Sequence, residues 1–308
     1  EETNGQMIYT RYKEEDIAFN PSSMNAIAIG EGAGGNSGGA VAGTQAATTI
    51  AIGKEAGKEN QQTQSIAIGP CAGEDTQGKS SVAIGFMAGN STQKNDSVAI
   101  GSQAGQIDQG NSGIAIGFQA GHRDQSGSTV AIGFNAGKTD QSKFSVAIGH
   151  QAGMSNQEST SVAIGADAGQ TNQKSAAIAI GQNAGQNTQN NSAIAIGLDA
   201  GQNDQGNSGV AIGFLAGQFS QQQSAIAIGE QSGQNDQKEN AIAIGSQCGA
   251  NNQGNSGVAI GGEAGKHFQG EFSISIGNGT GMRNQGFNSI AFGSKAAENN
   301  HCLLYTSD

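Results

Sequence analysis

The sequence predicts an all-β protein, a parallel β-solenoid or β-roll built from 16-residue coils. The glycine of an Ile-Gly pair falls at every sixteenth position from Gly53 to Gly293, with no insertion. A fixed period of this length is typical of stacked repeats. Within one copy, residues 81–85 alternate between small and β-branched side chains, which is the period of a strand. Glycine at two fixed places in each copy argues against a helical unit.

We number each copy from the residue equivalent to Ser81. Positions 1 to 5 predict a first strand, positions 10 to 13 predict a second, polar strand, and the residues between them predict corners. Glycine marks the first corner at Gly85 and Gly89, since its backbone adopts positive φ without strain. Glutamine recurs at position 13, and stacked amides form hydrogen-bonded ladders. The expected ladder includes Gln93, Gln109 and Gln125.

The second strand offers few apolar side chains, and packed sheets ordinarily lie about 10 Å apart. We therefore expect the β-branched residues of positions 2 and 4 to fill the interior, against the small residues of positions 8 and 12. The expected core residues are Val82, Val98, Val130, Ile84, Ile100, Ile116, Ile132 and Ile148. The small residues of position 3 then face outward and form the expected subunit interface, at Ala83, Ala99, Ala115 and Ala131.

The repeat predicts one solenoid of 17 coils over residues 26–300. Gly30 and Gly53 are 23 residues apart instead of 16, which indicates a loop insertion within residues 35–43. Residues 1–25 do not follow the repeat, and we expect a cap or part of a preceding region there. Residues 301–308 also depart from it. The run from Cys302 to Asp308 resembles a translated sequencing-library adapter, so we expect an artefact at this end.

Charge and motifs argue against several classes of function. The net charge is −11, which disfavours a nucleic-acid partner, and no apolar run is long enough for membrane insertion within this segment. No Ser/His/Asp or Cys/His arrangement repeats, so we expect no catalytic residue, no cofactor and no metal site. Cys71 and Cys248 lie eleven coils apart, too far for a disulfide, and Cys248, which replaces Ala at position 8, is expected to be a small hydrophobe.

Aspartate occupies position 12 in three successive coils, at Asp108, Asp124 and Asp140. Such a column is compatible with Ca²⁺ bound between coils, which requires several oxygen ligands at once. The other interpretation is a polar column in which Asn, Asp, Thr and Ser replace one another. We favour the second, because Asn156 and Thr92 occupy the same position in other coils.

The pentapeptide Ser-Val-Ala-Ile-Gly, found at 81–85, 97–101, 145–149 and 161–165, resembles the head repeats of YadA-like trimeric autotransporter adhesins. This resemblance implies a left-handed β-roll, a homotrimer, an extracellular or cell-surface location, and binding to a host-surface protein or glycan. The 16-residue period is longer than is usual in that family. This longer form resembles repeat proteins of large marine and algal viruses, which implies a virion surface.

Together these features predict a fibrous structural or adhesive surface protein, an adhesin head or viral fibre stalk, and not an enzyme. Two alternatives remain open. One is an ice-binding solenoid that uses the flat Ser/Ala/Gly face of positions 1, 3 and 5. The other is a repetitive spacer that binds no ligand.

Overall fold

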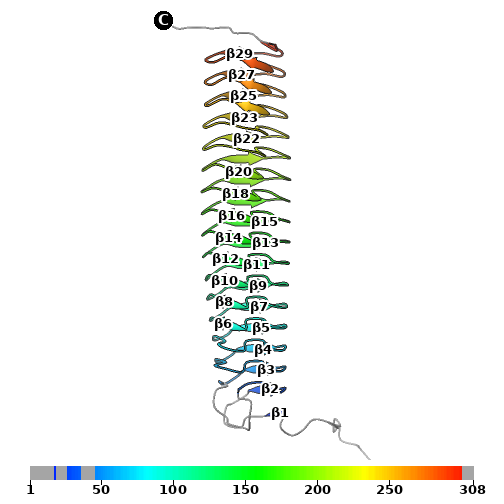
Figure 1. Cartoon of the computed structure of the whole chain (residues 1–308), viewed down its shortest axis with the longest axis vertical. Helices are drawn as coiled ribbons and strands as arrows, with labels where there is room; N and C mark the ends of the chain where they lie inside the picture. Colours follow the sequence, from blue (N-terminus) through cyan, green and yellow to red (C-terminus); the bar gives the residue numbers. More distant parts are fainter. Residues whose placement is uncertain (1–16, 19–25, 36–45, 300–308) are drawn as a thin grey trace, which may run out of the picture. The chain divides into compact units, whose positions relative to one another are not determined.

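A computed structural model of the chain describes residues 17–18, 26–35 and 46–299. The chain comprises two compact units, residues 1–124 and 125–308. In each unit the described residues form strands and turns, and parallel strands 16 residues apart stack coil upon coil (Figure 1). The predicted β-solenoid is confirmed, while the left hand implied by the resemblance stays a prediction. Residues 36–43 of the expected loop and the tail at 301–308 lie outside the described residues.

The first unit begins with β1 (Ile17–Ala18), which pairs antiparallel with β2. Six first strands then stack in parallel. Ile27 pairs with Ile50, 23 residues later, which agrees with a seven-residue insertion between the first two coils. The first strands are β2 (Ile27–Ile29), β3 (Ile50–Ile52), β4 (Ile66–Ile68), β5 (Val82–Ile84), β7 (Val98–Ile100) and β9 (Ile114–Ile116). The second strands are β6 (Ser91–Gln93), β8 (Ile107–Gln109) and the start of β10 (Arg123–Gln125).

The second unit repeats this arrangement with eleven first strands in uninterrupted parallel register. These are β11 (Val130–Ile132), β13 (Val146–Ile148), β15 (Val162–Ile164), β17 (Ile178–Ile180), β19 (Ile194–Ile196), β21 (Val210–Ile212), β22 (Ile226–Ile228), β23 (Ile242–Ile244), β25 (Val258–Ile260), β27 (Ile274–Ile276) and β29 (Ile290–Phe292). The second strands are β12 (Thr139–Gln141), β14 (Ser155–Gln157), β16 (Thr171–Gln173), β18 (Asn187–Gln189), β20 (Asn203–Gln205), β24 (Asn251–Gln253), β26 (His267–Gln269) and β28 (Arg283–Gln285).

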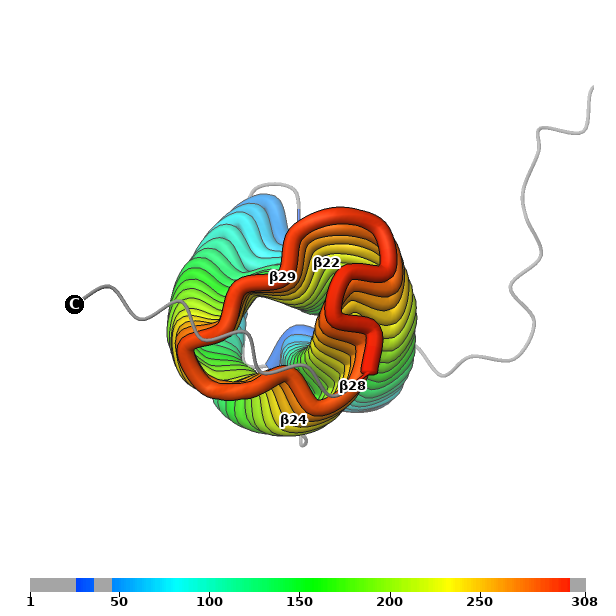
Figure 2. Tube along the Cα trace, turned by 90° about the horizontal axis from the view of Figure 1, so that it is seen from above, coloured from blue at the N-terminus to red at the C-terminus, as the bar shows by residue number. Residues whose placement is uncertain are grey.

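Left-handed backbone conformations make the corners of each coil. In one coil they fall at Gln151 (φ 52°), Gly153 (φ 51°), Asn156 (φ 56°) and Thr160 (φ 59°), and the same positions repeat along the chain. Asn, Asp and Gly tolerate this region better than other residues, which explains their frequency at positions 7, 9 and 12. Because each coil has the same backbone path, successive coils of a unit superpose when viewed end-on (Figure 2).

The interior is filled by the small residues of positions 1, 3 and 8 and by the glutamine of position 13. In the second unit, Ala147, Ala152 and Gln157 are all 0% exposed, whereas Ile148 is 36% exposed. The expected core is therefore wrong. Its members lie on the outer face and are partly or largely exposed: Val82, Val98, Val130, Ile84, Ile100, Ile116, Ile132 and Ile148.

The expected interface is wrong for the same reason. The residues Ala83, Ala99, Ala115 and Ala131 are completely buried inside their own coils. Position 12 was also assigned to the interior, but Asn156 and its equivalents lie largely on the surface. Only position 8 was placed correctly among the interior columns, as Ala88 and Ala152 are buried.

The physical reason is the narrowness of the coil. A Cβ atom added to Gly153 would lie 2.7 Å from Oε1 of Gln157 and 3.2 Å from Cβ of Ala147. A Cβ added to Gly149 would lie 2.5 Å from the carbonyl oxygen of Gly165 in the next coil. With one glutamine amide inside each coil, no room remains for two β-branched side chains, and the usual 10 Å sheet separation does not apply.

The glutamines of position 13 form an amide ladder inside each unit, from Gln61 to Gln109 in the first and from Gln125 to Gln269 in the second. Nε2 of Gln157 donates to the carbonyl of Val146 at 2.8 Å and to Oε1 of Gln173 at 3.1 Å, while its Oε1 accepts from Gln141. The glutamine side chain thus connects the second strand of each coil to the first by a hydrogen bond. The predicted ladder is confirmed at Gln93, Gln109 and Gln125, and the predicted corners are confirmed at Gly85 (φ 129°) and Gly89 (φ 52°).

The inverted burial can be tested by introducing the same side chain on the two faces of β13. We expect Ala147→Leu to destabilise the second unit by about 1–3 kcal/mol, because overpacking a closed interior forces backbone and side-chain shifts. Ile148→Leu, the matched control, conserves volume on the outer face and should leave the thermal unfolding midpoint nearly unchanged. A larger loss for Ile148→Leu than for Ala147→Leu would contradict this assignment.

The ladder can be tested with Gln157→Leu, which keeps the size of the side chain and removes its amide. The carbonyl of Val146 and the amides of Gln141 and Gln173 then each lose a partner. An unsatisfied buried polar group costs about 1–3 kcal/mol, so we expect at least that loss in chemical denaturation. Gln182→Leu is the control, since Gln182 is exposed and a surface change costs about 0.5 kcal/mol or less. Equal losses in the two variants would refute a structural role for the ladder.

Candidate functional site

In each unit, the outward side chains of the first strands form a continuous apolar surface, which we call the apolar ladder. It consists of the Ile or Val residues of positions 2 and 4. Each one lies beside its equivalent in the next coil, as Val146 pairs with Val162 and Ile148 with Ile164. Ile148, Ile164 and Ile180 are 36–37% exposed. Contiguous exposed apolar patches are typical of interaction surfaces, which makes this column a candidate for one.

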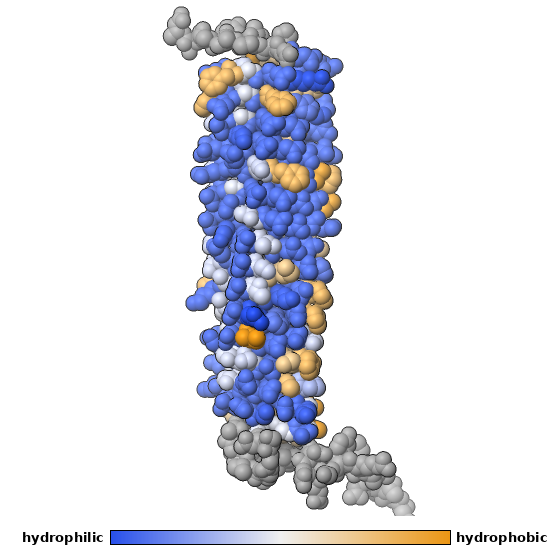
Figure 3. Space-filling view, viewed as in Figure 1, coloured by the Kyte–Doolittle hydropathy of each residue, from blue (hydrophilic) through white to orange (hydrophobic). Residues whose placement is uncertain are grey.

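Aromatic and aliphatic residues at position 6 widen this surface at the adjacent corner. In the first unit these are Phe86 and Phe118, and in the second they are Phe134, Leu198 and Phe214, all exposed. The ring of Phe134 stacks on that of His150, with centroids 5.3 Å apart and planes 5° apart. Hydrophobic side chains are sparse over most of the face seen in Figure 3 and gather along one edge of that view.

Most of the remaining surface is polar, apart from exposed phenylalanines at other positions such as Phe144, and many of its polar side chains hydrogen-bond along the stack. At position 10, the Gln234 amide donates to Gln218, which donates to Gln202, with distances of 3.0 and 3.1 Å. At position 11, Asn187 donates to Asn203 at 2.9 Å. These amide groups satisfy one another and also face water. The surface outside the apolar ladder is therefore hydrated, and the contrast makes the ladder the candidate functional site.

The aspartates of position 12 have a conformational explanation. Asp108, Asp124 and Asp140 have φ values of 53°, 56° and 55°, in the left-handed region. Asp and Asn are enriched there because their short polar side chains form local hydrogen bonds. The frequency of Asn and Asp in this column follows from that backbone requirement, which supports the polar-column interpretation over Ca²⁺. Thr92 and Thr188 adopt the same conformation, with φ of 60° and 55°.

A few ionisable groups have shifted pKa values. Lys174 Nζ lies 2.8 Å from Glu158 Oε1, and together with Ser175 it lowers the pKa of that carboxyl group. Burial raises the pKa of the Cys248 thiol to about 12. Burial, with added contributions from Glu74 and Glu55, raises that of Cys71 to about 11. Both thiols are thus protonated at neutral pH, which makes them poor nucleophiles.

The structure brings the predicted ladder glutamines and corner glycines together in each coil. The residues predicted to form the core lie on the outer face, and those predicted to form the interface lie inside. Sequence reasoning missed the apolar ladder as a surface. A signal was present in the sequence, because position 13 is glutamine in every copy from Gln61 to Gln285 while the neighbouring position 12 varies. A long side chain that recurs unchanged is expected in a closely packed interior, because only one side-chain shape fits there.

Within the part of the chain that the structure describes, no helix is long and apolar enough to cross a membrane. No family model, no curated protein and no solved structure matches this chain. The resemblance to the adhesin heads therefore depends on the pentapeptide.

Proposed function

We propose that this chain is a fibrous structural or adhesive surface protein, outside the cell or on a virion, that works as a homotrimer packed through the apolar ladder. The observation that carries the proposal is the apolar ladder. In the second unit, eleven coils present outward Ile, Val or Phe side chains in two columns, with no covering segment among the described residues. Burying such side chains stabilises an assembly by about 25 cal/mol per Å² of apolar surface removed from water.

The apolar ladder can associate with another copy through its side chains. Within each stack the backbone groups of the first strands already pair with neighbouring coils, so a partner approaching from the side finds side chains and no free strand edge. An ordinary interface buries about 800 Å² on each partner, and a stripe several coils long offers a surface of that order. The similarity of Ser-Val-Ala-Ile-Gly to trimeric adhesin heads supports three copies.

The burial pattern weighs against an ice-binding function of the Ser/Ala/Gly face. That alternative required the Ser/Ala/Gly face of the first strand to be exposed, and this face lies inside the coil. A regular flat face remains on the outside, but it is apolar and its columns lack hydroxyl groups. The spacer alternative differs from the proposal only in having no ligand.

The assembly can be tested by light scattering on the full chain at micromolar concentration. We expect a mass three times that of one chain. Replacing Ile148, Ile164 and Ile180 with Lys should give monomers, because three charges per chain would be buried without partners. Thr160, Ala176 and Ser192, all exposed, provide the control with the same added charge, and their replacement by Lys should leave the trimer intact. A monomeric wild type, or a triple Ile variant that assembles normally, would refute the proposal.

The adhesive role can be separated from a spacer role by binding of the assembled protein to arrays of glycans and extracellular-matrix proteins. We expect saturable binding that persists in the Thr160/Ala176/Ser192 control and falls at least tenfold in the Ile148/Ile164/Ile180 variant, since avidity from linked copies can exceed single-site affinity by about 10²–10⁴. An assembled trimer that binds nothing on either array would leave the structural role and remove the adhesive one.

A further inference from the structure

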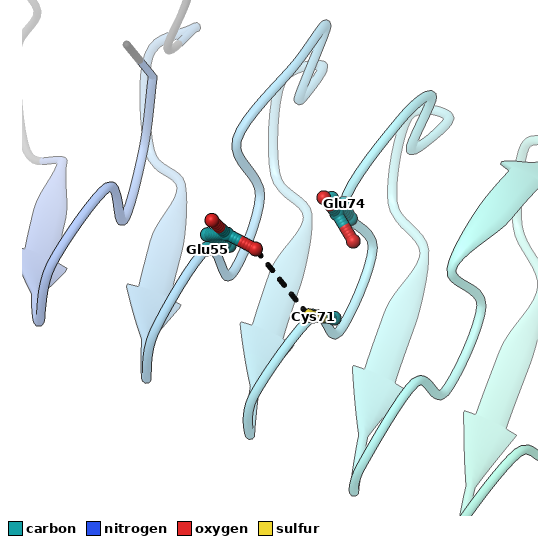
Figure 4. Close-up of side chains that lie close together, drawn as sticks. All are labelled: Glu55, Cys71 and Glu74. Atoms are coloured by element: carbon teal, nitrogen blue, oxygen red, sulfur yellow. Dashed lines mark hydrogen bonds between the residues drawn. The ribbon is translucent and has the colours of Figure 1, made fainter. Parts of the chain in front are cut away.

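A thiol and two carboxyl groups converge on the surface of the first unit, at the corner of the coil. Glu55, Cys71 and Glu74 come from two successive coils, and the ligand atoms that they offer all lie within 4.8 Å of one another. All three are partly buried. Figure 4 shows their side chains directed toward a common point, with Cys71 Sγ hydrogen-bonded to Glu55 Oε2 at 3.6 Å. Among the described residues, no other group of this kind is present.

The register of the solenoid creates this convergence. Glu55 and Cys71 occupy position 7 in adjacent coils, and both have left-handed backbones, with φ of 58° and 56°. Glu74 occupies position 10 and reaches the same place across the corner. Asn90 holds it there, because the Asn90 amide donates to Glu74 Oε2 at 2.9 Å and to the carbonyl of Cys71 at 3.0 Å. A hydrogen bond of this type orients a metal ligand from outside the coordination sphere.

We propose that Glu55, Cys71 and Glu74 bind a thiophilic divalent cation such as Zn²⁺, with water as the fourth ligand. Zn²⁺ accepts thiolate sulfur at about 2.3 Å and carboxylate oxygen at about 2.0–2.2 Å in tetrahedral sites. These bond lengths place neighbouring ligand atoms about 3.5 Å apart. The Cys71–Glu55 separation of 3.6 Å already meets this requirement, and the other ligand atoms, which lie within 4.8 Å of one another, must move closer when the metal binds.

The mixed donor set determines the class of metal. Ca²⁺ and Mg²⁺ prefer oxygen ligands alone, whereas a thiolate selects softer ions. On binding, the Cys71 thiol loses its proton to solvent, and the resulting thiolate and two carboxylates share the charge of the cation.

Lys58 is the present counter-ion of the two carboxylates. Its Nζ lies 3.5 Å from Glu74 and 3.9 Å from Glu55. A metal ion at this point must displace the ammonium group, which the flexible stem of lysine permits. Lys58 thus competes with the metal, and removing its charge should strengthen binding. This expectation distinguishes a metal site from a simple ion-pair cluster. In an ion-pair cluster, the loss of Lys58 would remove the ion pairs and strengthen no binding.

The site can be tested with Cd²⁺ as the probe, since a cadmium–thiolate bond gives a near-ultraviolet charge-transfer band. The parent is the full chain with Cys302→Ser, so that Cys302 contributes no thiol; Cys248 is completely buried. We expect one Cd²⁺ per chain, and Zn²⁺ should displace it. Cys71→Ser should abolish the band. Glu55→Gln and Glu74→Gln should each weaken binding by about tenfold or more, as even outer-sphere changes cost 10–100-fold.

Two variants complete the test. Lys58→Met should tighten Cd²⁺ binding several-fold. Glu59→Gln is the matched control, because Glu59 lies next to Lys58 in sequence but outside the cluster, and its loss should leave the affinity within about twofold. The proposal is overturned if the parent shows no band, if Cys71→Ser retains it, if the Glu55 and Glu74 variants bind as tightly as the parent, or if Lys58→Met binds more weakly.

Discussion

The glutamine amide inside each coil is the interaction on which the rest of the structure depends. Among the described residues, the largest fully buried side chains are these glutamines, and each bonds to the first strand of its own coil and to neighbouring glutamines of the stack. For Gln157 these bonds are 2.8–3.1 Å long. A buried amide is costly when unsatisfied, so each coil needs its neighbours in register. The fixed 16-residue period follows, because an insertion within the stack would break the ladder in both directions.

The amide also explains the inverted distribution of apolar residues. It occupies the space that larger apolar side chains would need, so only Ala, Ser and Gly fit around it, as at Ala147 and Gly153. The β-branched residues still favour the strand conformation, and they project outward from it. A coil of this kind gains little from burial of its own apolar groups. Its stability comes mainly from backbone ladders and close packing, and its outer ladder leaves apolar surface available for a partner.

The stack converts sequence spacing into proximity on the surface. Residues 16 or 19 apart become neighbours, so amide ladders such as Gln202–Gln218 and the Glu55, Cys71 and Glu74 cluster arise wherever suitable residues occupy adjacent coils. A search for motifs of adjacent residues misses them, because their members come from different coils, as Glu55 and Cys71 do. The corners allow this variation, since they impose a backbone conformation but leave the side chain free at positions 6, 7 and 10.

The sequence by itself determined the solenoid, the coil length, the two strands, the corner glycines at Gly85 and Gly89, the glutamine ladder and the insertion after the first coil. Each of these is a consequence of periodicity or of local backbone preference, which a single chain records directly. Only the tertiary structure decided which face of the first strand lies inside. Alternation fixes that Ala83 and Ile84 point in opposite directions, but it does not fix which is buried. That choice depends on the width of the closed coil, which the volume of Gln93 and the close approach of Gly89 set together.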